Sequence, residues 1–293
     1  MSLPEWIRDL IADGPVLLDG AWGTELQARG LAPGEMPDFW NLSQSDRVEE
    51  VARAYVEAGS QIILTNTFRA NRIAVGGHAD VDRIEEVNRA GVEISRRASA
   101  GTSRVFASIG PSGKLLLSGG VAPEDLRAAF DEQARSLAKA APDALIVETM
   151  TDLAEAEIAI AAAKETGLPV VACMVFDSGK RKDRTMMGVT PGEAAEALTN
   201  FGADIVGANC GNGIEGYIPV CAAMSAATDR PIWIKANAGI PEFVEGEFRY
   251  TTTPEEFVSY RGALIDAGAN FIGGCCGTSP SFIRALAAAK EAS

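Results

Sequence analysis

The chain alternates between two patterns of apolar and polar residues along its length. Eight short segments are almost continuously apolar and rich in β-branched residues, and most end in small or polar residues. They are residues 16–20, 61–68, 104–111, 144–150, 169–177, 204–211, 231–239 and 270–278. Continuous apolar runs of this length are typical of strands that are buried on both faces of a sheet.

Amphipathic stretches with the spacing of helices separate these segments. They cover residues 44–59, 80–101, 123–141, 151–167, 190–202, 214–229, 253–268 and 279–292. Thr190 and Glu193 are placed for a capping box at the start of one predicted helix. Glycine closes helices because it adopts the left-handed conformation without strain. Four predicted helices end at such a residue, namely Gly59, Gly167, Gly202 and Gly268.

Eight strand–helix units in 293 residues match the count and size of a (β/α)8 TIM barrel. No linker rich in proline, glycine and serine divides the chain, so we expect a single α/β domain over residues 1–293. The alternative is an open, doubly wound sheet. That fold normally has a glycine-rich phosphate turn after its first strand, and DGAWGTELQ at residues 19–27 is not such a turn.

Composition excludes several classes of protein. The net charge of −14 opposes binding to a nucleic-acid backbone, which requires a basic face. The sequence has no apolar run long enough to predict a membrane span, and its first residues lack the apolar centre of a secretory signal. Five cysteines are an odd and sparse set for a disulfide framework. We therefore expect a cytoplasmic protein whose thiols are metal ligands or catalytic groups.

Polar residues collect where the predicted strands end. In a (β/α)8 barrel the carboxyl ends of all strands surround one opening, and chemistry is located there. Six predicted strands end in such residues: Asp19-Gly20, Asn66-Thr67, Glu148-Thr149, Asn209-Cys210, Asn237 and Cys275-Cys276. These side chains are distant in sequence, yet the fold predicts that they converge.

The adjacent pair Cys275-Cys276 is the least ordinary feature. A disulfide between neighbours is unfavourable, because their Cα atoms are only about 3.8 Å apart. Two inert, buried cysteines are the alternative. The flanking glycines favour a turn that points both sulfurs to one place. With Cys210 at the same opening, the pattern predicts a three-cysteine zinc site whose fourth position is open to substrate.

The remaining candidates fit other roles better. His78 lies in a loop-like GGHAD stretch, so we expect it to be exposed and to be neither a ligand nor a base. Cys173 and Cys221 fall inside a predicted strand and a predicted helix, which indicates core positions. With a single histidine, a hydrolytic triad is disfavoured. Asp19 and Glu148 are either helix caps or site residues, and their place beside the cysteines favours the site.

Seven stretches resemble one family across almost the whole chain. They are LLDGAWGTELQ, TNTF, IGPSG, IVETM, GANCG, NAG and GGCCGTSP, in that order. GGCCGT with an upstream NC is the most specific of them. The chain resembles the homocysteine S-methyltransferases, which include the homocysteine-binding module of cobalamin-dependent methionine synthase, the betaine enzymes and the S-methylmethionine enzymes.

The resemblance implies a zinc-dependent S-methyltransferase that forms methionine by methyl transfer to a zinc-bound thiolate. It implies one zinc ion per chain, held by Cys210, Cys275 and Cys276, and no tightly bound organic cofactor. It places the amino-acid part of homocysteine near Asp19, Gly20, Thr67 and Glu148. It further implies that Asn209 braces the site and that Asn237 occupies the open zinc position before substrate arrives.

The methyl donor stays open at this point. It is S-methylmethionine, S-adenosylmethionine, betaine or methylcobalamin, the last on a possible separate corrinoid protein. Gly277 follows the cysteine pair where S-methylmethionine enzymes more often have arginine, which slightly favours the corrinoid-linked donor. Two alternatives remain: a methyltransferase for another thiol or selenol, including a corrinoid-linked demethylating subunit, and a non-enzymatic zinc- or thiol-binding protein.

Overall fold

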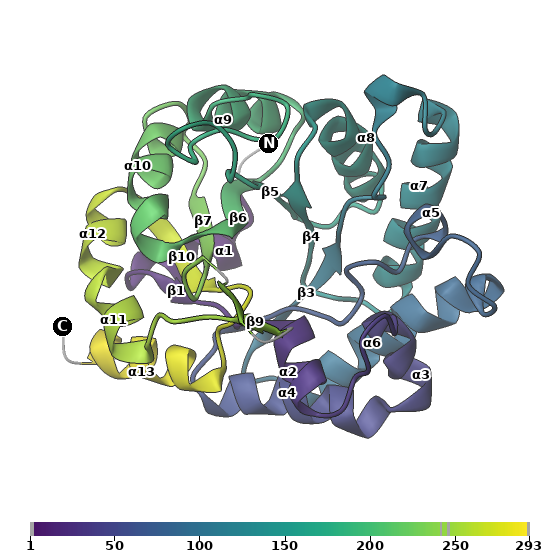
Figure 1. Ribbon diagram of the computed structural model, residues 1–293, viewed down its shortest axis with the longest axis horizontal. Coiled ribbons are helices and arrows are strands. Elements are labelled where there is room, and N and C mark those ends of the chain that lie inside the picture. The colour runs from purple at the N-terminus through teal and green to yellow at the C-terminus, as the bar shows by residue number, and fades with distance from the viewer. Residues whose placement is uncertain (1–2, 241, 245–246, 292–293) are drawn as a thin grey trace.

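Eight parallel strands form a barrel in the computed structural model, which describes residues 3–240, 242–244 and 247–291. In spatial order they are β1 (Val16–Leu17), β10 (Ala269–Gly274), β7 (Ile232–Asn237), β6 (Ile205–Gly213), β5 (Val170–Met174), β4 (Ala144–Met150), β3 (Arg104–Ile109) and β2 (Ile62–Ile63). Helices form an outer ring around these strands (Figure 1). The predicted (β/α)8 barrel is therefore confirmed.

The barrel closes between β1 and β2 through a single residue. The backbone N–H of Gln61 donates to the carbonyl of Leu17 over 2.8 Å, and the Leu17 N–H donates to the Gln61 side chain over 3.1 Å. Beyond this point side chains replace the backbone ladder, because the Asp19 carboxylate accepts from Leu64 N over 2.7 Å. The first two strands are for this reason shorter than the apolar segments predicted.

The predicted helices are present with small differences. They are α4 (Ser45–Glu57), α6 (Ile84–Ser99), α7 (Pro123–Lys139), α8 (Leu153–Lys164), α9 (Pro191–Asn200), α10 (Ile214–Ser225), α11 (Pro254–Ser259), α12 (Arg261–Asp266) and α13 (Pro280–Glu291). The stretch predicted as one helix over 253–268 is thus two, divided at Tyr260. The capping box of Thr190 and Glu193 is confirmed, and all four predicted terminal glycines have positive φ.

Shorter elements decorate the two ends of the barrel. They are α1 (Glu5–Ala12), α2 (Trp22–Ala28), α3 (Trp40–Ser43), α5 (Arg72–Val75), the 3-10 turns η1 (Pro37–Phe39), η2 (Val81–Arg83) and η3 (Leu116–Ser118), and the hairpin of β8 (Glu242–Val244) and β9 (Glu247–Arg249). The sequence patterns did not predict them. No described helix is long and apolar enough to cross a membrane.

Helix α1 closes the amino-terminal end of the barrel. Its Ile7 is fully buried and belongs to the cluster of apolar side chains that fills the barrel interior, with Phe106 and Trp233. Trp6 meets the Phe106 ring edge-on with 6.1 Å between centroids, and it also lies under the guanidinium of Arg104, the first residue of β3. Solvent therefore reaches the barrel interior from the opposite end.

The filling of the barrel changes from apolar to polar toward that open end. Side chains alternate along a strand, so a residue two positions after an inward-facing one also faces inward. Buried Ile146 is followed in this way by Glu148, and buried Trp233 by Lys235. The last layer of the interior thus carries charge, and the functional site is built on it.

Candidate metal centre and substrate pocket

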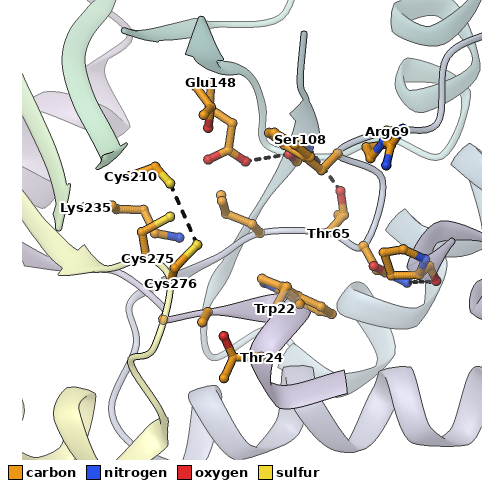
Figure 2. A pocket seen from close by; sticks show the side chains of 18 of the residues that line it. Trp22, Thr24, Thr65, Arg69, Ser108, Glu148, Cys210, Lys235, Cys275 and Cys276 are labelled. Carbon is orange, nitrogen blue, oxygen red and sulfur yellow. Dashed lines mark hydrogen bonds between the residues drawn. The ribbon is translucent and has the colours of Figure 1, made fainter. Parts of the chain in front are cut away.

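Three thiols meet at the open end of the barrel. Cys210 lies in β6, and Cys275 and Cys276 directly follow β10. All three Sγ atoms are within 4.8 Å of one another, and those of Cys210 and Cys276 are 3.7 Å apart. Figure 2 shows the three side chains converging on one side of a pocket. The cluster that the sequence predicted is brought together.

The turn after β10 points both neighbouring sulfurs the same way. Cys275 N donates to the carbonyl of Ala236 over 2.6 Å, which continues the β7–β10 ladder by one residue. The chain then turns sharply, with Thr278 Oγ1 donating to the Cys275 carbonyl over 2.7 Å. Gly277 makes this turn with φ of 80°, a conformation that residues with a Cβ rarely adopt.

Cys210 is itself in a strained conformation. Its φ is 62°, in the left-handed region that non-glycine residues seldom occupy. Its carbonyl accepts a hydrogen bond from Tyr217 Oη over 2.5 Å, which helps to hold the conformation. Thr149, at the end of β4, has a φ of 61° and donates its N–H to the side chain of Asn209 over 2.8 Å. Such strain is concentrated at functional sites.

The pKa values of the three thiols differ because the thiols form hydrogen bonds with one another. Hydrogen bonds from Cys275 and Cys276 lower the pKa of Cys210 to about 3, against the effect of burial. The same hydrogen bonds raise the pKa of Cys275, and the hydrogen bond to Cys210 with burial raises the pKa of Cys276 to about 12. Hydrogen bonding within the cluster thus favours the thiolate form of Cys210 over that of Cys275 or Cys276, and a bound metal ion would displace the remaining protons.

The surroundings of the sulfurs fit a metal ion. Thiolates are the ligands that zinc prefers in proteins. The Asn237 side chain donates to Cys210, and its Oδ1 is buried without a hydrogen-bond partner among the described residues. A buried amide oxygen without a partner is unusual and is consistent with a ligand that binds there. The resemblance implies that Asn237 occupies the open metal position, and this stays a prediction.

A cavity of about 320 Å³ opens in front of the sulfurs. Its walls combine charged groups with apolar side chains. The residues include Gly20, Trp22, Pro37, Asp38, Leu64, Thr65, Asn66, Phe68, Arg69, Ser108, Glu148, Cys210, Lys235, Cys275 and Cys276. Thr65 and Arg69 lie across the pocket from the cysteines (Figure 2). A cavity of this size holds a small amino acid and part of a second molecule.

Glu148 presents a carboxylate to this cavity. Its Oε1 accepts from Ser108 Oγ over 2.5 Å, and its Oε2 accepts from Asn209 Nδ2 over 3.1 Å. Burial raises the pKa of Glu148, while the positive charge of Lys235 acts in the opposite direction. Asn209 also donates to Thr149 Oγ1 over 2.8 Å, so its amide links the end of β4 to β6.

Asp19 and Thr67 lie behind the pocket wall. Asp19 is fully buried and forms an ion pair with Lys235, and it also accepts from Trp22 Nε1 and Leu64 N over 2.7 Å each. Lys235 and Trp22 line the pocket in its place. Thr67 is likewise fully buried: its hydroxyl contacts that of Thr65 at 2.6 Å and donates to the Ser108 carbonyl over 2.7 Å.

Gly20 does line the pocket, and its lack of a side chain matters. A Cβ at this position would be 2.8 Å from the ring of Tyr55 and 2.9 Å from the hydroxyl of Thr278. The other cysteines and the histidine stay apart from the cluster. Cys173 and Cys221 are buried, and His78 is partly exposed and stacked on Phe39 with 3.9 Å between ring centroids.

Sequence reasoning missed Lys235. This residue is fully buried, lines the pocket and carries a positive charge that the neighbouring Asp19 and Glu148 stabilise. A signal was present, because lysine interrupts the otherwise apolar run IWIKANAG. A buried lysine is rare unless it is paired, so such an interruption indicates a carboxylate partner nearby.

Residues 16–290 match the family model described as homocysteine S-methyltransferase. The chain belongs to this family. The barrel and the three clustered thiols at its open end are consistent with an enzyme of the homocysteine S-methyltransferase family.

Curated relatives of the homocysteine S-methyltransferase family cover the chain almost completely. The chain is 29% identical over 302 aligned positions to methionine synthase of Mycobacterium tuberculosis, which covers 97% of this chain and 25% of the relative. It is 28% identical to betaine–homocysteine S-methyltransferase 1 of Danio rerio, with 96% of this chain and 74% of the relative aligned. The chain thus spans about a quarter of the length of the methionine synthase.

Solved structures show the same fold. The metallated form of the homocysteine methyltransferase MmuM from Escherichia coli aligns with a TM-score of 0.78 and 24% identity, over 97% of this chain and 99% of that one. Its oxidized form gives a TM-score of 0.79 over 98% and 100%. The overall fold is therefore shared along almost the full length of both chains.

Proposed function

We propose that this protein is a zinc-dependent homocysteine S-methyltransferase that forms methionine. The observation that carries the proposal is the group of three thiols within 4.8 Å of one another at the wall of a cavity that also presents Glu148. Three protein ligands leave a position for substrate, as catalytic zinc sites do. The family to which the chain belongs supports the choice of homocysteine as acceptor.

Zinc would supply a Lewis acid that keeps the acceptor sulfur deprotonated at neutral pH, where a free thiol with a pKa near 8.5 is mostly protonated. The chain's own residues would orient the reactants. Glu148 and Gly20 both line the cavity, and the Glu148 carboxylate would attract the ammonium group of an amino acid. Correct orientation alone can supply roughly 7–11 kcal/mol of rate acceleration.

The side chains that face the substrate would be held in position by buried neighbours, namely Asp19, Thr67 and Asn209. Asp19 fixes Lys235 and Trp22, and Asn209 fixes Glu148. Asn237, whose amide oxygen has no other partner in the described residues, would fill the open metal position until the acceptor thiol replaces it.

The donor would enter along the apolar part of the cavity, which Trp22, Pro37 and Phe68 line. Gly277 bears on the class of donor. A Cβ at this position would lie 2.2–2.6 Å from ring atoms of Tyr250, so an arginine here requires Tyr250 to move. The absence of that arginine continues to favour a donor carried on a corrinoid over S-methylmethionine.

Methionine formation followed by mass spectrometry tests the proposal. Zinc-loaded protein receives homocysteine with S-methylmethionine, S-adenosylmethionine, betaine or methylcobalamin in separate reactions. We expect methionine from one of these donors, and none from Cys275→Ser. The matched control is Cys221→Ser, which changes a buried cysteine outside the site. Full activity and zinc content in Cys275→Ser would refute the proposal.

A further inference from the structure

We propose that Lys235 binds the carboxylate of the acceptor, so that the pocket selects thiols that carry a carboxylate. The inference rests on the proposed function, because it names a contact to the acceptor at the same site. Lys235 would thus determine specificity in a position that the family's strand-end motifs do not mark.

The first argument is the unused hydrogen-bonding capacity of the Lys235 ammonium. A lysine ammonium has three N–H donors. Within the described part of the chain, the Lys235 ammonium has one hydrogen-bond partner, Asp19 Oδ1. Its side chain is only 2% exposed, yet it lines the cavity beside Cys275 (Figure 2). Two donors of a desolvated cation are therefore available to a ligand in the cavity.

The second argument is the distribution of charge around the thiols. Glu148 lines the same wall, and Asp19 lies directly behind it in an ion pair with Lys235. Both of these carboxylates repel a carboxylate of the ligand. Among the described residues that line the cavity, the cations are Lys235 and Arg69, and Arg69 is exposed on the side away from the cysteines. Of these two cations, Lys235 is thus the one placed for a carboxylate bound close to the sulfurs.

The third argument is complementarity to a zwitterion. Glu148 offers a site for an ammonium group, Lys235 a site for a carboxylate, and the thiol cluster a site for sulfur. An α-amino acid with a thiol side chain carries these three groups on a few bonded atoms. Binding at three points fixes one orientation of the sulfur, which is the purpose of such a pocket.

A purely structural role for Lys235 is the competing explanation, since an unpaired buried Asp19 would be costly. That role requires no lysine at the cavity surface, because Asp19 also accepts hydrogen bonds from Trp22 and Leu64. The two explanations differ in whether the effect of removing Lys235 depends on the carboxylate of the ligand.

The test is a binding cycle measured by isothermal titration calorimetry on metal-loaded protein. The ligands are homocysteine, aminopropanethiol (homocysteine without its carboxylate) and mercaptobutyrate (homocysteine without its amino group). In the Lys235→Met variant we expect homocysteine and mercaptobutyrate to bind about 10- to 100-fold more weakly, as for the loss of a charge-assisted hydrogen bond. Aminopropanethiol should bind as it does to the unchanged protein.

Two further variants keep the test decisive. Asp19→Asn/Lys235→Met removes the ion pair without leaving a buried charge, and it should show the same carboxylate-dependent loss. A double variant that binds all three ligands normally would instead establish the structural role. Arg69→Met, the matched control for a cation on the opposite wall, should leave all three affinities unchanged.

The outcomes separate this inference from the function on which it rests. Equal weakening of homocysteine and aminopropanethiol by Lys235→Met, or no weakening of either, overturns the inference while the acceptor assignment stands. If no thiol binds to the metal-loaded, unchanged protein, the proposed function itself fails.

Discussion

Cys210 shows at the scale of a single residue how strain and chemistry coincide. Its left-handed backbone costs on the order of 1–2 kcal/mol, and the hydrogen bond from Tyr217 to its carbonyl offsets part of that cost. The conformation turns the sulfur toward Cys276 instead of along the ladder. Non-glycine residues in a left-handed conformation cluster at functional sites, which supports a functional role for the Cys210 thiol.

Replacing this sulfur should remove the metal without unfolding the protein. We expect Cys210→Ser to bind zinc far more weakly than the unchanged chain, because one of three thiolate ligands is lost. Zinc content after dialysis against a weak chelator, measured by plasma mass spectrometry, checks this. Cys221→Ser is the control and should retain the metal; equal zinc in both variants would contradict the ligand assignment.

The buried carboxyl of Asp38, which lines the same cavity as the thiols, predicts a pH dependence of stability. Burial raises its pKa to about 6 from an ordinary value of 3.8, and its Oδ2 has no hydrogen-bond partner in the described residues. Between about pH 4 and pH 6 the Asp38 carboxyl is therefore protonated in the folded state and ionised in the unfolded state. Stability falls as pH rises from about 4 to about 6 and is constant above that range.

Asp38→Asn should accordingly stabilise the protein at pH 8 by up to about 3 kcal/mol, with a gain about 1 kcal/mol smaller at pH 5. Urea denaturation at both pH values measures the two differences. Asp9→Asn, at an exposed position of α1, is the control and should change stability little at either pH. A gain that grows toward acid pH would contradict the assignment.

The residues of the site were predictable to different degrees. The thiol cluster followed from strand ends alone, because the barrel brings all carboxyl ends of strands to one opening. Which side chain faces the cavity did not follow. Asp19 and Thr67 stand behind Lys235, Trp22 and Thr65, and depth of this kind is decided by contacts between strands far apart in sequence.

At the scale of elements, the apolar segments predicted the strands and the long amphipathic stretches predicted the main helices, whereas the shorter helices α1, α2, α3 and α5 were not predicted. Helix α1 has eight residues, which is too short to be stable in isolation. It depends on packing against the end of the barrel, which the local sequence does not reveal. The two-residue strands β1 and β2 were predicted too long because Asp19 and Thr65 take over backbone partners, with Thr65 Oγ1 accepting from Ser108 N over 3.0 Å.

Helix α1 should contribute to stability as part of the core. Ile7→Ala removes a fully buried side chain from the closed end of the barrel and should cost about 2–5 kcal/mol. Arg8→Ala, one position along on the exposed face, should cost much less. The free energy of unfolding in urea distinguishes them, and equal values would show that α1 does not pack as described.

At the scale of the whole molecule, the three thiols that we propose as metal ligands come from two strands that are not neighbours. Cys210 is in β6 and Cys275 follows β10, and β7 lies between these strands in the sheet. A metal ion bound to both therefore spans three adjacent strands. Because such an ion would bind the folded chain preferentially, it would add to global stability by mass action.

Removal of the metal should lower the melting temperature. Free zinc at about 100 times its dissociation constant contributes about 2.7 kcal/mol, which corresponds to a shift on the order of 5 °C for a chain of this size. Calorimetry with zinc and with a chelator measures the shift. Cys210→Ser should melt at one temperature in both conditions, and a shift that persists in this variant would indicate a different metal site.

The barrel closes through Gln61, and its wall is joined in two ways. One part is held by backbone ladders, and the other is held largely by side-chain hydrogen bonds. β7 pairs through backbone ladders with β6 and with β10, the strands that position the thiols, with register shifts at Ala269/Phe271 and Asn209/Gly213. The opposite wall follows the two-residue strand β2, and side chains tie it to its neighbours. Because side chains constrain a wall less than a backbone ladder does, we expect a bulky second reactant to be accommodated by adjustment of the far wall rather than of the strands that position the sulfurs.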